Sequence, residues 1–209
     1  LVNADDEGIL GRFDVASVAG LDSAEHMDNA NNELVMMCVL LMVAGNETTR
    51  NAISGGMQCL IENPGERDKL LRDPSLLPGA CEEIVRWVSP VHSFSRTATA
   101  RAELRGQRVE EGQQVLMLYP SANRDEDLFA DPDRFAVGRR PAHVGFGIGN
   151  HFCLGANLAR MELRVAFEEL LRRFPDMTYA EDGPVLRPSS LVRSCVEMKV
   201  RYTPEKCAA

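Results

Sequence analysis

The sequence predicts a mainly α-helical fold with a small β region, and three patterns support this. Residues 33–61 form a long segment of helical character, and the run that follows Leu154 has apolar residues at helical spacing. Strand-like alternation is short and is confined to residues 94–119 and to the tail. The chain has 209 residues, 44% of them hydrophobic and 26% charged, so we expect residues 1–209 to form a single domain around one core.

The amino-terminal part divides into a connector and the longest helix. Residues 1–32 are polar and contain several glycines and asparagines, so we expect a connector there. Residues 33–61 are apolar on nearly every side, so this helix should run through the core until Pro64 ends it. Two shorter helices are expected over residues 66–72 and 75–88, because prolines bound both segments.

The middle part, residues 62–142, continues from those two helices into strands and an irregular segment. Residues 94–98, 103–104 and 113–119 have strand character with glycines between them, which predicts a small antiparallel sheet. Residues 120–141 are rich in Asp, Arg and Pro and have little pattern of their own. We therefore expect side-chain contacts to hold that segment in place.

The last part, residues 143–209, contains a glycine-rich turn, a long amphipathic helix and a short β tail. The helix follows Leu154 and is stopped by Pro175. Alternation over residues 191–202 predicts a terminal hairpin or edge strands.

Charge and hydropathy exclude several classes of partner. The chain has 23 basic and 31 acidic residues and a net charge of −8, which argues against a nucleic-acid or anionic-membrane binder. The longest apolar run, Leu34 to Ala44, has eleven residues and is too short to span a membrane. The amino terminus is acidic rather than basic, so we expect a cytoplasmic protein. Six scattered cysteines form no CxxC pattern, and most are expected to be reduced and structural.

A glycine-punctuated turn, FGIGNHFCLG over Phe146 to Gly155, places Cys153 before the long helix. The free N–H groups and the macrodipole at a helix start stabilise a thiolate anion. Gly147, Gly149 and Gly155 allow positive φ and let the backbone approach a flat macrocycle closely. A lone cysteine can also be a small core residue, and a glycine-rich turn can bind phosphate. The Lys-Ser or Lys-Thr that a phosphate loop needs is absent from this sequence.

A second unusual string, AGNETT over Ala44 to Thr49, lies inside the apolar helix. Glycine costs a helix about 1 kcal/mol relative to alanine, and threonine is a poor helix former, so an apolar core alone does not explain this choice. Ala44, Gly45 and Thr48 share one face, where small residues leave room for a ligand. A hydroxyl beside the carboxylate of Glu47 can relay protons. The alternative is a helix-packing face whose threonine bonds to the carbonyl four residues back.

A third string, Glu83-Ile84-Val85-Arg86, puts an acid and a base on one helical face. Most such pairs are solvated and contribute little to stability. This pair instead lies between proline-bounded segments, in front of the strands and the irregular segment.

These three strings resemble elements of cytochrome P-450, the haem-thiolate monooxygenases. The string at 146–155 resembles FGxGxHxCxG, the string at 44–49 resembles (A/G)GxETT, and the string at 83–86 resembles ExxR. Along the chain they follow one another in the order found in that family. The resemblance covers about residues 33–202 and implies the carboxy-terminal, haem-bearing part of that mainly α fold. It implies haem b as cofactor, with Cys153 as the axial iron ligand, and it implies that Thr48 and Glu47 relay protons. It also implies that Glu83 and Arg86 form a buried structural pair completed by Arg134. The remaining cofactor-binding residues are then Ala44, Gly45, Phe146, Gly147 and Gly155, with Arg96 and His151 on the haem propionates.

For His151 the alternative is a turn residue exposed to solvent. For His143 no role beyond loop structure is expected.

The same resemblance implies a reaction and its partners. One oxygen atom of dioxygen would be inserted into a C–H bond of a hydrophobic small molecule, with electrons from NAD(P)H supplied through a ferredoxin reductase and a ferredoxin. The substrate class suggested by analogy is sterols, terpenoids or fatty acids. A peroxide-driven peroxygenase of the same family is an alternative. The resemblance argues against it, because members of that type have an Arg-Pro pair at the position where this chain has Glu47-Thr48.

The chain also departs from the family pattern. It begins at Leu1 and is considerably shorter than family members, so we expect a partial domain. An inactive or incomplete haem-binding fragment is therefore the third alternative.

Overall fold

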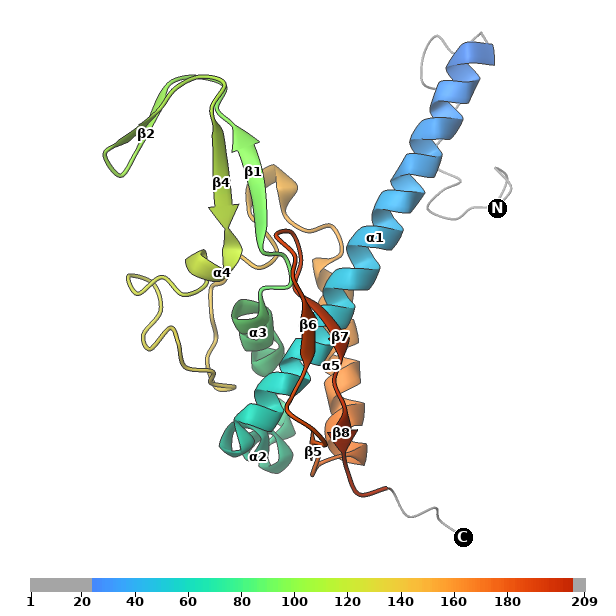
Figure 1. Cartoon of the computed structure of the whole chain (residues 1–209), viewed down its shortest axis with the longest axis vertical. Coiled ribbons are helices and arrows are strands. Elements are labelled where there is room, and N and C mark those ends of the chain that lie inside the picture. The colour runs from blue at the N-terminus through green and yellow to red at the C-terminus, as the bar shows by residue number, and fades with distance from the viewer. Residues whose placement is uncertain (1–23, 205–209) are drawn as a thin grey trace. The chain divides into compact units, whose positions relative to one another are not determined.

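The computed structural model describes residues 24–204 (Figure 1). The chain divides into two compact units, of which the first ends at Ala44 and the second begins at Gly45. The helices are α1 (Ala24–Glu62), α2 (Pro64–Arg72), α3 (Leu77–Val88), α4 (Tyr119–Ala122) and α5 (Ala156–Arg173), with 3-10 turns at Pro74–Leu76 and Gly149–His151. The strands are β1 (Ser93–Thr97), β2 (Ala102–Leu104), β3 (Gln107–Val109), β4 (Gln114–Leu118), β5 (Thr178–Tyr179), β6 (Val185–Arg187), β7 (Ser194–Glu197) and β8 (Val200–Arg201). The predicted mainly helical class is confirmed.

The long helix differs from the prediction in where it begins and in how much of it is buried. It begins at Ala24 instead of Glu33, so part of the expected connector is helical, while residues 1–23 lie outside the described part of the chain. In the first unit, nine large apolar side chains between Leu34 and Val43 are at least 38% exposed. The expectation that this helix runs through the core therefore holds only for its later part, which contributes Ala52, Met57 and Leu60 to the core. The described part of this unit, residues 24–44, contains only the helix itself, so it offers nothing for those side chains to pack on.

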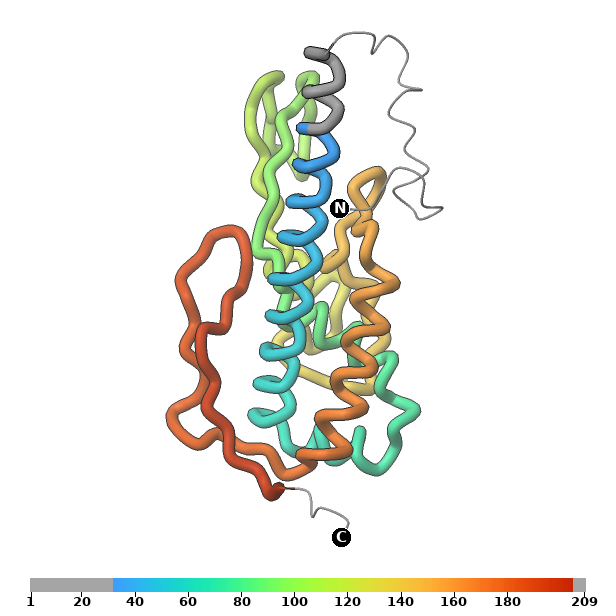
Figure 2. The backbone as a smooth tube through the Cα atoms, turned by 90° about the vertical axis from the view of Figure 1, so that its right-hand side faces the viewer, coloured from blue at the N-terminus to red at the C-terminus, as the bar shows by residue number. Residues whose placement is uncertain are grey.

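The core of the second unit forms where the later part of α1 meets α3 and α5, and this part of α1 runs beside α5 (Figures 1 and 2). Two adjacent glycines allow the close approach. A Cβ added to Gly56 would lie 2.6 Å from Cζ of Phe167 and 2.8 Å from Cγ2 of Ile84, both fully buried. A Cβ added to Gly55 would lie 2.8 Å from Cγ1 of Val88. Glycine is needed here because any side chain would separate the three helices.

The strands form four antiparallel pairs among the described residues. β1 pairs with β4, with Phe94 opposite Met117, and β2 pairs with β3 as a separate hairpin. Over the tail, β7 pairs with β6 and β8 pairs with β5. The predicted strand positions near residues 194–201 hold. Of the two expected arrangements, the structure has edge strands and not a hairpin within residues 191–202, because both strands pair with earlier segments of the tail in two-stranded sheets.

No helix in the described part of the chain is long and apolar enough to span a membrane.

Candidate functional site

The turn around Cys153 is closed by its own backbone. Its start and end are joined by the Cys153 amide, which donates to the Phe146 carbonyl at 2.8 Å. Within the turn, the Gly147 amide donates to the Val144 carbonyl at 2.8 Å. Gly147 and Gly149 have φ of 71° and 65°, which a side chain rarely tolerates, so the two glycines are required by the path of the backbone.

The helix that follows begins slightly later than predicted. α5 begins at Ala156, whose amide donates to the Cys153 carbonyl at 3.2 Å, and Gly155 is the N-cap. Gly155 has a φ of −86°, so the expectation of a positive φ is wrong at that position. A Cβ added there would meet nothing within 4 Å, which means that the glycine leaves open space beside the turn.

Cys153 differs from the other described cysteines in its environment. It is exposed, whereas Cys59 and Cys81 are buried and Cys38 and Cys195 are intermediate. Burial raises the pKa of the Cys59 thiol and of the Cys81 thiol to about 12, so both remain protonated at neutral pH. Among the described cysteines, Cys153 therefore has the best access for a ligand.

The surroundings of Cys153 fit a flat, largely apolar cofactor. The turn carries three exposed apolar side chains, Ile148, Phe152 and Leu154, with exposed fractions of 74%, 51% and 84%. Gly149 and Gly155 add open space, because a Cβ at either position would meet no atom within 4 Å. Soluble proteins rarely leave such a group of apolar side chains uncovered around a potential metal ligand unless something binds there.

The two cations expected near the cofactor carboxylates lie on different elements. His151 ends the short 3-10 turn just before Cys153, and its side chain is exposed. Arg96 is exposed on β1, where its Nη1 donates to the carbonyl of the neighbouring Ser95 at 2.9 Å. Both side chains are accessible to a carboxylate, and the structure shows no contact that joins them among the described residues.

On α1, the Glu47 carboxylate takes part in a local polar network. It accepts two hydrogen bonds from Nη2 of Arg50, both at 2.7 Å, in an ion pair whose side chains are 57% (Arg50) and 40% (Glu47) exposed. Nδ2 of the buried Asn51 donates to Glu47 at 3.4 Å, and Oδ1 of Asn51 accepts from the Cys195 amide of β7 at 3.1 Å. Asn51 thus anchors both the acid and the tail, a role the sequence pattern did not indicate. Thr48 is half-buried beside Glu47.

The small residues of that string lie on either side of the boundary between the units. Ala44 ends the first unit and is exposed, and Gly45 begins the second. A Cβ added to Gly45 would meet nothing within 4 Å, so this glycine is not required by helix packing in the described structure.

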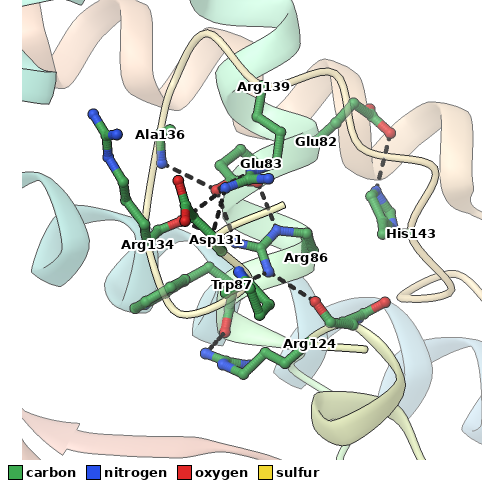
Figure 3. Close-up of polar contacts among 12 residues, drawn as sticks. Glu82, Glu83, Arg86, Trp87, Arg124, Asp131, Arg134, Ala136, Arg139 and His143 are labelled. Carbon is green, nitrogen blue, oxygen red and sulfur yellow. Dashed lines mark hydrogen bonds and ion pairs between the residues drawn. The ribbon is translucent and has the colours of Figure 1, made fainter. Parts of the chain in front are cut away.

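The Glu83–Arg86 pair on α3 is fully buried. Figure 3 shows its polar contacts. Arg86 donates to both Glu83 oxygens, at 2.7 Å from Nε and 2.9 Å from Nη2. Its remaining N–H groups reach the carbonyls of Asn123 at 2.7 Å, Pro132 at 3.0 Å and Arg134 at 3.3 Å. All five donors of this guanidinium have acceptors, which is the condition under which a buried ion pair is stable.

The third member of this network is Arg139, which corrects the assignment to Arg134. Nε of Arg139 donates to Oε1 of Glu83 at 3.3 Å, and its other nitrogens donate to three carbonyls of the irregular segment (Figure 3). Arg134 is exposed, and it enters the network only through its backbone carbonyl. The expectation fails because the chain turns between the two arginines, which directs the later side chain inward.

A buried asparagine, Asn123, connects this network to the cysteine turn. Its carbonyl accepts from Arg86, its Nδ2 donates to Oγ of Ser89 at 2.9 Å, and its Oδ1 accepts from the Val144 amide at 2.9 Å. Val144 in turn accepts from Gly147. Displacement of Arg86 would therefore be transmitted to the start of the turn. An asparagine in an irregular segment carries no periodic signal, so its role could not be predicted from the sequence.

Comparison with known proteins gives consistent similarities. The model of the family described as cytochrome P450 matches residues 19–191. The chain is 43% identical over 193 residues to the steroid C26-monooxygenase of Mycolicibacterium smegmatis, covering 91% of this chain and 48% of that relative. It is 52% identical over 156 residues to the methyl-branched lipid omega-hydroxylase of Mycobacterium bovis, covering 73% of this chain and 36% of that relative.

Solved structures agree with these relatives. The tirandamycin C-bound P450 monooxygenase TamI has a TM-score of 0.81 at 40% identity, over 88% of this chain and 46% of that one. CYP109E1 from Bacillus megaterium in complex with testosterone has a TM-score of 0.77 at 38% identity, over 82% of this chain and 48% of that one. The chain spans about half the length, or less, of the curated relatives it matches.

Proposed function

The chain belongs to the cytochrome P450 family, and we propose that it forms the haem-bearing part of a monooxygenase in which Cys153 is the axial iron ligand. The observation that carries this proposal is the exposed cysteine in a glycine turn before α5, surrounded by exposed apolar side chains. Exposure lets the sulfur reach a metal, and the helix start favours its anionic form.

We propose that several residues of this chain hold haem b. Gly147 and Gly155 would let the macrocycle lie close to the backbone. Phe146, whose carbonyl accepts a hydrogen bond from the Cys153 amide, would hold the turn in place. His151 and Arg96 are exposed cations that would bind the haem propionates with charge-assisted hydrogen bonds. Ala44 and Gly45 would leave room beside the cofactor on α1. When bound, a thiolate-ligated haem supplies the activation of dioxygen for insertion of one oxygen atom into a C–H bond.

We propose that Glu47 and Thr48 deliver the protons. The Glu47 carboxylate is 40% exposed and is held by Arg50, so it can exchange protons with solvent. Thr48 is the next residue and is half-buried, so its hydroxyl can pass a proton inward. This pair also distinguishes the proposal from a peroxide-driven enzyme, which needs no such delivery.

The substrate and the electron donors are part of the proposal. The relatives named for steroids and for methyl-branched lipids suggest a hydrophobic substrate of one of these two classes. We propose dioxygen as co-substrate, with electrons from NAD(P)H delivered by a ferredoxin reductase and a ferredoxin, at a cytoplasmic location.

The proposal is tested by turnover of the native protein that contains this chain, loaded with haem. Purified protein is incubated with a steroid or a methyl-branched fatty acid, NAD(P)H, and a ferredoxin with its reductase, and hydroxylated product is measured. Thr48→Ala should continue to consume NAD(P)H and dioxygen but release hydrogen peroxide in place of product. Ser54→Ala, six residues further along α1, serves as the matched hydroxyl control. Product formed only with added hydrogen peroxide would identify a peroxygenase, and failure to retain haem would contradict the proposal altogether.

A further inference from the structure

A second charged cluster lies beside the cysteine turn and has no part in the function described so far. Glu82 points away from its neighbour Glu83 (Figure 3) and accepts from Nε of Arg160 on α5 at 2.7 Å and from Nη2 at 3.0 Å. Nε2 of His143 lies 3.1 Å from the second Glu82 oxygen. The cluster therefore joins α3, α5 and the segment that precedes the turn.

The hydrogen bonds of His143 define its tautomer. The Gly145 amide donates to Nδ1 of His143 at 3.0 Å, so Nδ1 carries no proton. The proton of the neutral ring is then on Nε2, where it is donated to Glu82. The side chain of His143 is only 3% exposed, and a Cβ added to Gly145 would lie 3.2 Å from its Nδ1, so the ring is closely packed against the Gly145 backbone.

The cluster reaches Cys153 through Phe146. The Arg160 guanidinium lies 4.6 Å from the centroid of the Phe146 ring, and the His143 ring lies 5.6 Å from it. The Phe146 carbonyl accepts the Cys153 amide at 2.8 Å. A planar guanidinium can lie on an aromatic ring and bind a carboxylate in bidentate fashion at the same time, whereas a lysine cannot.

The electrostatics of the cluster agree with this geometry. Burial raises the pKa of Glu82, but hydrogen bonds from His143 and Arg160 outweigh it and lower the pKa to about 2. The hydrogen bond to Glu82 raises the pKa of Arg160, and the charge of a Cys153 thiolate raises it further.

We propose that Arg160 is a positioning residue for Cys153. Its guanidinium, oriented by Glu82 and His143, holds Phe146 in place, and the Phe146 carbonyl accepts a hydrogen bond from the Cys153 amide. The inference rests on the proposed function of Cys153 as the iron ligand and adds to it the residues that fix the ligand's geometry.

The experiment compares variants of the haem-loaded native protein. The reduced carbonyl complex has an absorption band typical of a thiolate ligand. The experiment measures the thiolate share, which is the fraction of the complex that shows this band, and it also measures the reduction potential. In Arg160→Gln the share of the form without thiolate should rise several-fold because Phe146 is no longer held, and the potential should fall because the cluster loses a positive charge. Arg160→Lys should retain most of the potential but not the thiolate share. Arg173→Gln, which removes an exposed arginine from the same helix, should change neither quantity.

A double-mutant cycle tests whether the cluster acts as a unit. Glu82→Gln should lower the thiolate share in the same direction, and the double variant should be no worse than Arg160→Gln alone. Additive effects, or an unchanged thiolate share and potential in folded Arg160→Gln, would overturn the inference. If Arg160→Gln does not retain haem, an unchanged thiolate share in Arg160→Lys would overturn it equally. Absence of the thiolate band in the unmodified protein would instead contradict the proposed function.

Discussion

Replacement of Glu83 by alanine should destabilise the fold strongly. The variant removes the acceptors of Arg86 Nε at 2.7 Å and Nη2 at 2.9 Å, and of the Ala136 amide at 3.0 Å and Arg139 Nε at 3.3 Å. The guanidinium of Arg86 would remain buried without its counter-charge. Breaking a buried pair in this way costs about 3–5 kcal/mol, a large part of the roughly 5–15 kcal/mol that stabilises a typical domain.

The consequence is measurable as a melting temperature and as haem occupancy. For a domain of this size, a loss of about 3–5 kcal/mol corresponds to a fall in melting temperature of roughly 6–20 °C. Thermal unfolding followed by circular dichroism, with haem content per chain, provides the assay. Glu169→Ala is the matched control, because Glu169 also contacts two arginines but lies exposed on α5, and it should change little. A melting temperature of Glu83→Ala equal to that of this control would refute the reasoning.

Three further predictions concern other contacts of the second unit. Arg139→Ala should lower the free energy of unfolding by about 1–3 kcal/mol, because it removes hydrogen bonds to Glu83 and to three carbonyls. Arg134→Ala keeps the carbonyl that Arg86 uses and should change this free energy by less than about 0.5 kcal/mol. Chemical denaturation measures both values, and equal effects would contradict the corrected assignment. Gly56→Ala should destabilise by about 1–3 kcal/mol through overpacking, and Gly65→Ala, whose Cβ meets nothing within 4 Å, should not. The pKa of Glu82 is lowered from 4.5 to about 2, so its contribution to stability is complete above pH 4.5 and is lost as the pH falls toward 2. The difference in free energy of unfolding between the native protein and Glu82→Gln should shrink over that interval, and a constant difference would contradict the shift.

The parts of the fold that could be predicted from sequence are those with local signals. The α5 pattern and the prolines around α2 and α3 located these helices, because periodicity and backbone chemistry act within a few residues. The burial of the Glu83–Arg86 pair was expected from the family resemblance and not from its spacing, because most pairs at that spacing are solvated. The strand partners of the tail were not, since pairing depends on segments distant in sequence.

The parts of the candidate site that were missed depend on tertiary contacts. Arg139 and Asn123 lie in an irregular segment, where no periodicity shows which side chain turns inward. Gly56 is read from sequence as a helix-weakening residue, and only the position of Phe167 shows that a side chain would not fit. His143 was expected to have a loop role alone, yet its partner Glu82 lies on α3.

The assignment of Cys153 as the thiolate ligand is tested most directly by the absorption of the reduced carbonyl complex of the haem-loaded native protein. The account predicts a thiolate-type band in the unmodified protein and in Cys195→Ser, which alters a partly exposed cysteine of the tail. It predicts loss of that band in Cys153→His. A thiolate-type band that persists in Cys153→His would show that another cysteine binds the iron and would contradict the account.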